Sequence, residues 1–394
     1  MTTPNSATQQ WPPGRGNYDK FVATYGQELA NRFAQGFLTA DPVADALFTS
    51  GHAVREIMPN LRDALARGEA NEDTFPEVAA LLEDMKVALE NIDQERYERG
   101  RAVYLSISPL VHGLAVGPGS LVHTYSTPAI ADLLVNTGEL TDGAVKRLAY
   151  TTNWTYSLYL PEGVQPGSKG FMHTGMVRAM HAHVRRVHAS RDFDYGDWGV
   201  AINEIDMLRT WFDFTYIPYK GLRNMGWTIT EEQEQDIYYL WKVVGRMVGI
   251  AEDLMEGNDD IASSERTMEA IHSIDGEPDQ ASQDLVDALM TGFVVNVNAL
   301  TEVPEESLAD WTAAYTRIIH GHEVADSYGV AKSIMQPIIE METEARAERY
   351  NLLRANPEAL QAEIEKNEQM HIALLDDEPA YLKQDNGIAT KASA

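Results

Sequence analysis

The 394-residue chain contains no cysteine. Disulfide bonds, thiolate-ligated haem, covalent CxxCH haem attachment, iron–sulfur clusters and cysteine-type structural zinc sites are therefore excluded. Any bound metal must be held by histidine, aspartate, glutamate, tyrosine or methionine.

Basic residues are scarce beside acidic ones, with 31 Lys and Arg against 60 Asp and Glu and a formal net charge of −29. Such a charge opposes binding to phosphate backbones and to anionic lipid headgroups. We therefore expect no nucleic-acid partner. The charge does not indicate the substrate, and the sequence does not indicate the oligomeric state.

Long apolar runs are also missing, since none approaches the roughly 18 residues that span a bilayer. The N-terminus has neither the basic start nor the apolar stretch of a secretory signal. We expect a cytoplasmic protein without a membrane span.

Sustained alternation of apolar and polar residues, the pattern typical of strands, is lacking. Apolar residues instead recur at helical spacing, and no composition shift marks an internal boundary, so we predict a single all-α domain over residues 18–375. The Pro- and Gly-rich residues 1–17 are predicted to be disordered, and residues 376–394 to form a polar tail. Gly117-Pro118-Gly119 predicts a turn, and Pro218 predicts the end of a helix that begins near Val200.

The most informative stretch runs from Arg147 to His188. Arg147 and Thr151 are four residues apart, so they share one face of a helix. His181 follows 30 residues after Thr151, beyond a breaker-rich segment, 161–170, that lets a second helix return alongside the first. We predict two helices that face each other across a pocket, one bearing a cation and a hydroxyl and the other an imidazole able to hold a metal.

At these residues the chain resembles the latex clearing protein and mpaB-like oxygenase family, which binds b-type haem. The resemblance covers about residues 100 to 256. Its pieces, in order, are the Arg147-x3-Thr151 pair, His181, the run Asp206, Thr210 and Phe214, and the segment Trp241–Ile250, which is similar to a Trp-Gly-Gly-Ile segment of the family.

The resemblance implies an all-α, globin-like core that encloses haem b and catalyses an oxygenase reaction. His181 would ligate the iron and dioxygen would bind opposite it. Arg147 and Thr151 would stand beside the haem, and a hydrophobic substrate, for example an isoprenoid or another alkene, would be oxidised. The alternative is a core or surface histidine at 181, a snorkelling arginine at 147, and a hydroxyl at 151 bonded to its own backbone.

Other residues near His181 are candidates for contact with the cofactor. His183 points about 200° away around the helix, so it cannot bind the same iron. His188, Arg178 and Arg185 are candidate partners of the haem propionates, and the two arginines could equally be solvated helix charges.

Two further candidates lie on the next predicted helix. Asp206 and Thr210 are expected to pack near the cofactor. The alternative is core packing, with the carboxylate paired to an arginine.

The chain departs from the rubber-cleaving branch of the family at two positions. Tyr150 stands where that branch has a lysine, and Ala131 where it has a glutamate proposed as a base, with Asp132 adjacent. Haem binding is therefore better supported than polyisoprene cleavage. The Tyr150 phenol is a candidate catalytic group, as a donor to bound oxygen.

The sequence is also compatible with two other functions. Glu269/His272 and Glu368/His371 are Glu-x-x-His pairs, the spacing by which two helices build a non-haem di-iron carboxylate site of an oxidoreductase. A haem-binding carrier or sensor without turnover is the other alternative.

Overall fold

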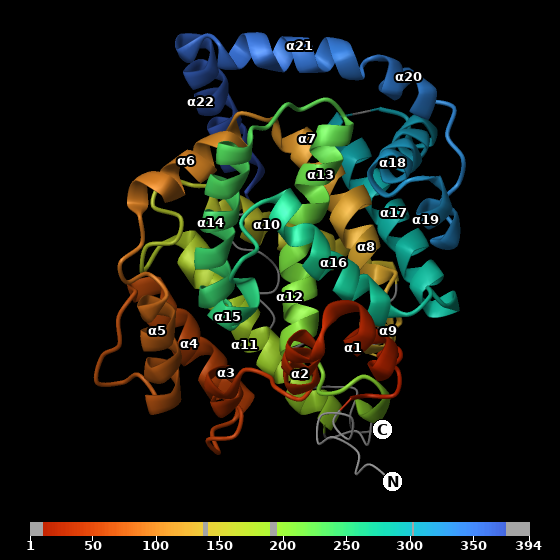
Figure 1. Ribbon diagram of the computed structural model, residues 1–394. Coiled ribbons are helices and arrows are strands. Elements are labelled where there is room, and N and C mark those ends of the chain that lie inside the picture. Colours follow the sequence, from red (N-terminus) through yellow and green to blue (C-terminus); the bar gives the residue numbers. More distant parts are fainter. Residues whose placement is uncertain (1–10, 137–140, 190–194, 302, 376–394) are drawn as a thin grey trace.

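The computed structural model describes residues 11–136, 141–189, 195–301 and 303–375. Every regular element in these ranges is a helix, which confirms the predicted single all-α domain (Figure 1). The first helices along the chain are α1 (Tyr18–Tyr25), α2 (Gln27–Gly36), α3 (Pro42–Ala46), α4 (Val54–Arg67), α5 (Pro76–Val87), α6 (Gln94–Leu105) and α7 (Pro109–Leu114).

The π-helix η2 (Ala115–Leu121) continues α7 and leads into the central part of the chain. The elements that follow are α8 (Val122–Tyr125), α9 (Pro128–Asn136), α10 (Thr141–Leu158), α11 (Lys169–Ala189), the short 3-10 helix η3 (Tyr195–Asp197), α12 (Glu204–Phe212), α13 (Tyr216–Asn224), α14 (Glu231–Met247) and α15 (Glu252–Met255). The last are α16 (Ile261–Asp275), α17 (Gln280–Thr301), α18 (Glu305–His320), α19 (His322–Ser327), α20 (Gln336–Met341), α21 (Thr343–Arg354) and α22 (Pro357–Leu374).

Figure 1 shows α1 to α5 gathered at one end of the molecule and α21 lying across the opposite end, with α12, α13 and α14 running between them. Buried apolar side chains form a large core among these helices and a smaller one around Leu289 and Phe293 of α17. Among the described residues no single helix has the length and apolarity of a membrane span, while Gln94–Leu105 and Pro109–Tyr125 pass that test only as a pair bent by 89°.

Residues 11–17 are ordered, so the predicted disorder of residues 1–17 is wrong for this part. Trp11 packs against Tyr18, Phe21 and Phe37, with ring centroids 5.1–5.4 Å apart. Arg15 is 1% exposed and donates from its Nη2 to Asp206 at 2.7 Å. One tryptophan and one buried ion pair are enough to hold a segment whose composition is otherwise typical of a loop. Residues 1–10 and 376–394 lie outside the described residues.

The predicted turn at Gly117-Pro118-Gly119 is instead part of the buried π-helix η2. A Cβ on Gly117 would lie 2.7 Å from a ring carbon of Phe293, so glycine here permits a helix to approach closely. The Pro118 carbonyl accepts a hydrogen bond from the Thr316 hydroxyl at 3.1 Å. Residues that usually break helices therefore serve packing here.

Gly117→Ala should lower the free energy of unfolding by about 1–3 kcal/mol, because the new methyl group overlaps the Phe293 ring. Gly113→Ala is the matched control, since its Cβ would meet that ring only at 3.9 Å, an ordinary contact. Urea unfolding of the two variants measures the difference. Equal stability of the two would show that the close approach is not strained.

Pro218 does not end a helix, contrary to the prediction. The break falls earlier, between the end of α12 at Phe212 and the start of α13 at Tyr216. Pro218 occupies the first turn of α13, where a helix needs no backbone N–H donor. The change of direction after α12 is what turns Asp213 into the core.

Candidate functional site

Helices α10 and α11 lie against each other, as predicted from the breaker-rich segment between them. Trp154 Nε1 donates to Thr174 Oγ1 at 3.0 Å, and His173 Nδ1 lies 3.0 Å from Ser157 Oγ. Because the helices are antiparallel, this register continues toward the start of α10 and places residues 147–151 opposite residues 177–183. The predicted pairing of the two helices is thus confirmed, whereas the side chain of Arg147 lies outside the described residues.

His181 is half-buried, and its Nδ1 is enclosed without a hydrogen-bond partner. Burial, and to a smaller extent the nearby Arg185 charge, lower the pKa of this imidazole to about 4, against an opposing effect of Asp41. The ring is therefore neutral at pH 7. A neutral imidazole with an unpaired nitrogen is suited to metal ligation.

A hollow of about 270 Å³, including space open to solvent, lies beside His181. It is lined by residues of α11, α12 and the segments before α3 and after α14, including Asp41, Met207 and Gly249. None of its lining residues belongs to α10, so this hollow is not the predicted pocket between the two facing helices. Gly249 has a φ of +96°, and a Cβ there would lie 2.5 Å from Asp41 Oδ2. The glycine at this position thus leaves room for the ion pair beside the hollow.

The two arginines flanking His181 are buried in ion pairs. Arg178 bonds Asp41 Oδ2 at 2.6 Å and Asp84 Oδ2 at 2.6 Å, and Arg185 bonds Asp45 Oδ1 at 2.8 Å. The alternative of solvated helix charges is therefore wrong. The physical reason is that α3 and α5 pack on α11 and bring carboxylates to it. Contact with a propionate stays a prediction.

The remaining predicted site residues are Arg147, Tyr150 and Thr151 on α10 and His188 on α11. The side chains of Arg147 and His188 lie outside the described residues, although both positions are helical. Thr151 is half-buried, and its carbonyl accepts a hydrogen bond from the Thr155 hydroxyl at 2.7 Å. Tyr150 is also half-buried. The catalytic roles of Arg147, Tyr150 and Thr151 stay predictions.

Asp206 and Thr210 lie on α12. The Asp206 carboxylate pairs with Arg15, as the core-packing alternative expected, and the Thr210 hydroxyl donates to the Asp206 carbonyl at 2.8 Å. Phe214 follows the end of α12 and stacks on Trp241 with ring centroids 4.5 Å apart. These contacts are the core packing of the alternative, and proximity of Asp206 and Thr210 to the cofactor stays a prediction.

The two Glu-x-x-His pairs do not come together, which removes the structural basis of the di-iron alternative. Glu269 is exposed on α16, and Glu368 on α22 pairs with Arg101 at 2.6 Å. His272 lies near His123, whereas His371 Nε2 lies 3.4 Å from the Tyr104 hydroxyl. The spacing predicted one shared site, but the two helices belong to different parts of the fold (Figure 1).

Burial lowers the pKa of His371 to about 4, well below its ordinary 6.5. Between these two values the unfolded chain binds a proton that the folded chain does not, so stability falls as the pH is lowered from 6.5 toward 4. His371→Gln should reduce the stability lost between pH 7 and pH 5 by about 2 kcal/mol. Urea unfolding at both pH values tests this, with the exposed His322→Gln as a control that should change the stability at pH 7 by no more than about 0.5 kcal/mol.

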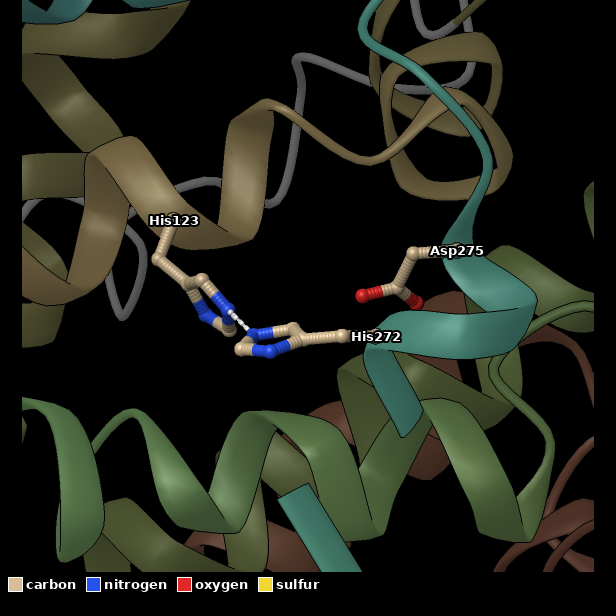
Figure 2. A group of neighbouring side chains, drawn as sticks. All are labelled: His123, His272 and Asp275. Carbon is tan, nitrogen blue, oxygen red and sulfur yellow. Dashed lines mark hydrogen bonds between the residues drawn. The ribbon is translucent and has the colours of Figure 1, made fainter. Parts of the chain in front are cut away.

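One cluster was missed by sequence reasoning. His123 of α8 meets His272 and Asp275 of α16, and the candidate ligand atoms of these three residues lie within 4.8 Å of one another (Figure 2). The only sequence signal was the three-residue spacing of His272 and Asp275 on one helix face. His123 lies 149 residues away and shows no motif.

Comparisons with known proteins agree on the family and the fold. The profile of the family described as ER-bound oxygenase mpaB/B'/rubber oxygenase, catalytic domain, matches residues 102–348. The solved structure of latex clearing protein in the closed state matches with a TM-score of 0.65 and 19% identity, over 93% of this chain and 96% of that one. No curated protein matches.

Proposed function

Because the chain belongs to the mpaB and rubber oxygenase catalytic-domain family, we propose that it is a haem b-dependent oxygenase that acts on a hydrophobic substrate. The observation that carries the haem assignment is that His181, at the family's ligand position, borders the hollow and has an enclosed Nδ1 without a hydrogen-bond partner. His183 Nδ1 also lacks a partner, but that ring packs against Phe48 and does not line the hollow. An unpaired buried nitrogen is costly unless something binds it. Haem iron is a partner of the right chemistry.

His181 would hold the iron from α11, and Arg147, Tyr150 and Thr151 would line the other side from α10. When bound, the haem supplies the activation of dioxygen. The Thr151 hydroxyl and the Tyr150 phenol can donate hydrogen bonds, and the Arg147 guanidinium can attract negative charge. Phe214, Trp154 and Trp241 pack behind these helices and exclude water.

The size of the hollow also leads to an expectation. Pockets that hold small ligands usually measure about 300–1,000 Å³. The enclosed space beside His181 is far smaller, at about 10 Å³, which is room for about one water molecule. Haem does not fit this space as it stands, so its binding should move the lining side chains apart and should protect α11 and α12, which line the hollow, from amide hydrogen exchange.

An absorption spectrum of the protein expressed with ample haem supply tests the proposal. We expect an intense Soret band and about one extractable haem per chain. A folded but colourless protein would refute haem binding. Oxygen uptake by the reduced protein separates an oxygenase from a carrier, since an isoprenoid alkene should stimulate it and the saturated analogue should not. Equal uptake with the two compounds would favour the carrier.

A further inference from the structure

His123, His272 and Asp275 form a second group of potential metal ligands, on α8 and the last turn of α16 (Figure 2). The Nε2 atoms of the two histidines are 2.8 Å apart. His123 is 2% exposed and Asp275 7% exposed, whereas His272 lies at the solvent edge. The group is therefore anchored in the core and open to entry on one side.

The surroundings prepare His123 as a ligand. Its Nδ1 lies 2.6 Å from Asp213 Oδ1, and Asp213 Oδ2 accepts a hydrogen bond from Thr124 at 2.5 Å. When the Asp213 carboxylate accepts a hydrogen bond from Nδ1, Nε2 presents its lone pair toward His272. A carboxylate behind a histidine is the usual arrangement around metal-bound imidazole.

The Asp275 carboxylate is also positioned by a neighbouring side chain. Its Oδ2 accepts a hydrogen bond from Arg209 Nε at 3.0 Å. Its Oδ1 is buried and has no hydrogen-bond partner. An unsatisfied buried carboxylate oxygen beside two imidazole nitrogens points to a cation that is not part of the chain.

We propose that His123, His272 and Asp275 bind a divalent transition-metal ion, with water completing its coordination. Two histidines and one carboxylate are a ligand set for zinc and for non-haem iron. Nitrogen ligands of a tetrahedral zinc lie about 3.3 Å apart, given Zn–N distances of about 2.0–2.1 Å. The two rings must therefore part by about half an ångström, which the exposed His272 ring is free to do. Its proton moves from Nε2 to Nδ1 through solvent.

This site is separate from the one proposed at His181. Met207 lines the hollow at His181, while Arg209 holds Asp275 and donates to the His123 carbonyl at 2.6 Å. Positions two apart on a helix point in nearly opposite directions, so α12 stands between the two sites. A metal here would tie α8, directly after the distorted η2, to the end of α16.

His320 is the remaining histidine beside the cluster and is not one of the proposed ligands. Its ring stacks on His123 with centroids 6.1 Å apart, and its Nε2 lies 2.9 Å from the Gly119 carbonyl. A carbonyl only accepts, so this nitrogen carries a proton and cannot bind a metal.

Zinc binding to the full-length, chelator-treated protein tests the proposal. Equilibrium dialysis with elemental analysis for zinc is not disturbed by haem iron. We expect one zinc per chain, a weakening of at least about 100-fold in His272→Ala, and no change in the exposed control His322→Ala. Haem content should be the same in both variants. Because His272 is exposed, we expect His272→Ala to fold normally, and circular dichroism of the variant checks this.

Zinc should also raise the melting temperature of the unaltered protein and of His322→Ala, but not that of His272→Ala. If the unaltered protein binds zinc no more tightly than His272→Ala, the proposal is wrong. The cluster is then a hydrogen-bonded Asp213–His123–His272 chain that serves packing alone.

Discussion

Replacing His181 by alanine should lower the haem content of the purified protein at least about tenfold, since the substitution removes the imidazole that would hold the iron. The Soret absorbance relative to protein absorbance measures the change. The substitution removes a half-buried ring that makes no hydrogen bond through Nδ1, so the chain should stay folded. Addition of free imidazole should restore part of the Soret band by filling the vacated position.

His183→Ala is the matched control for this experiment. His183 lies on the same helix, is half-buried and packs against Phe48 with ring centroids 5.2 Å apart, on the other side of α11 from His181. The haem content of the His183→Ala variant should equal that of the unaltered protein. Loss of haem in His183→Ala and retention in His181→Ala would show that the ligand is assigned to the wrong residue.

Replacing Arg178 by methionine should lower the free energy of unfolding by about 3 kcal/mol. Arg178 is 3% exposed and holds Asp41 of the α3 N-terminus and Asp84 of α5 against α11. Removal of the guanidinium leaves the largely buried Asp41 carboxylate without its cation, and that uncompensated charge accounts for most of the loss. The half-exposed Asp84 contributes less. Urea unfolding measures the effect.

Arg186→Met is the control, because Arg186 is exposed on the same helix and its replacement should change stability by no more than about 0.5 kcal/mol. The pair of variants also tests the predicted propionate contact of Arg178. Loss of haem at unchanged stability would assign Arg178 to the cofactor. Loss of stability with haem still bound would assign it to the scaffold.

Local patterns predicted those parts of the site that lie close together in the sequence. The four-residue spacing of Arg147 and Thr151, and the breakers before the His181 helix, predicted two facing helices. The hydrogen bond from Trp154 to Thr174 confirms that pairing. Helical periodicity and the family motifs depend on residues within one or two turns of a helix. They can therefore be recognised in the sequence without knowledge of the rest of the fold.

Contacts between distant segments were not predictable in this way. Arg15 belongs to a segment whose composition indicates disorder, yet it pairs with Asp206, 191 residues away. Gly117 looks like a turn residue but meets Phe293 of α17. Glu-x-x-His spacing suggested that His272 and His371 share a metal, whereas His272 lies beside His123.

The sequence by itself determined that the chain is helical, that it lacks thiol chemistry, and to which oxygenase family it belongs, because composition, periodicity and short motifs carry that information within a few residues. Only the tertiary structure decided which charges neutralise Arg178 and Arg185, why His181 is neutral, and that His123 meets Asp275. These outcomes depend on which helix faces pack together. Packing brings together residues that are far apart in the sequence, and no periodic pattern in the sequence indicates such pairs.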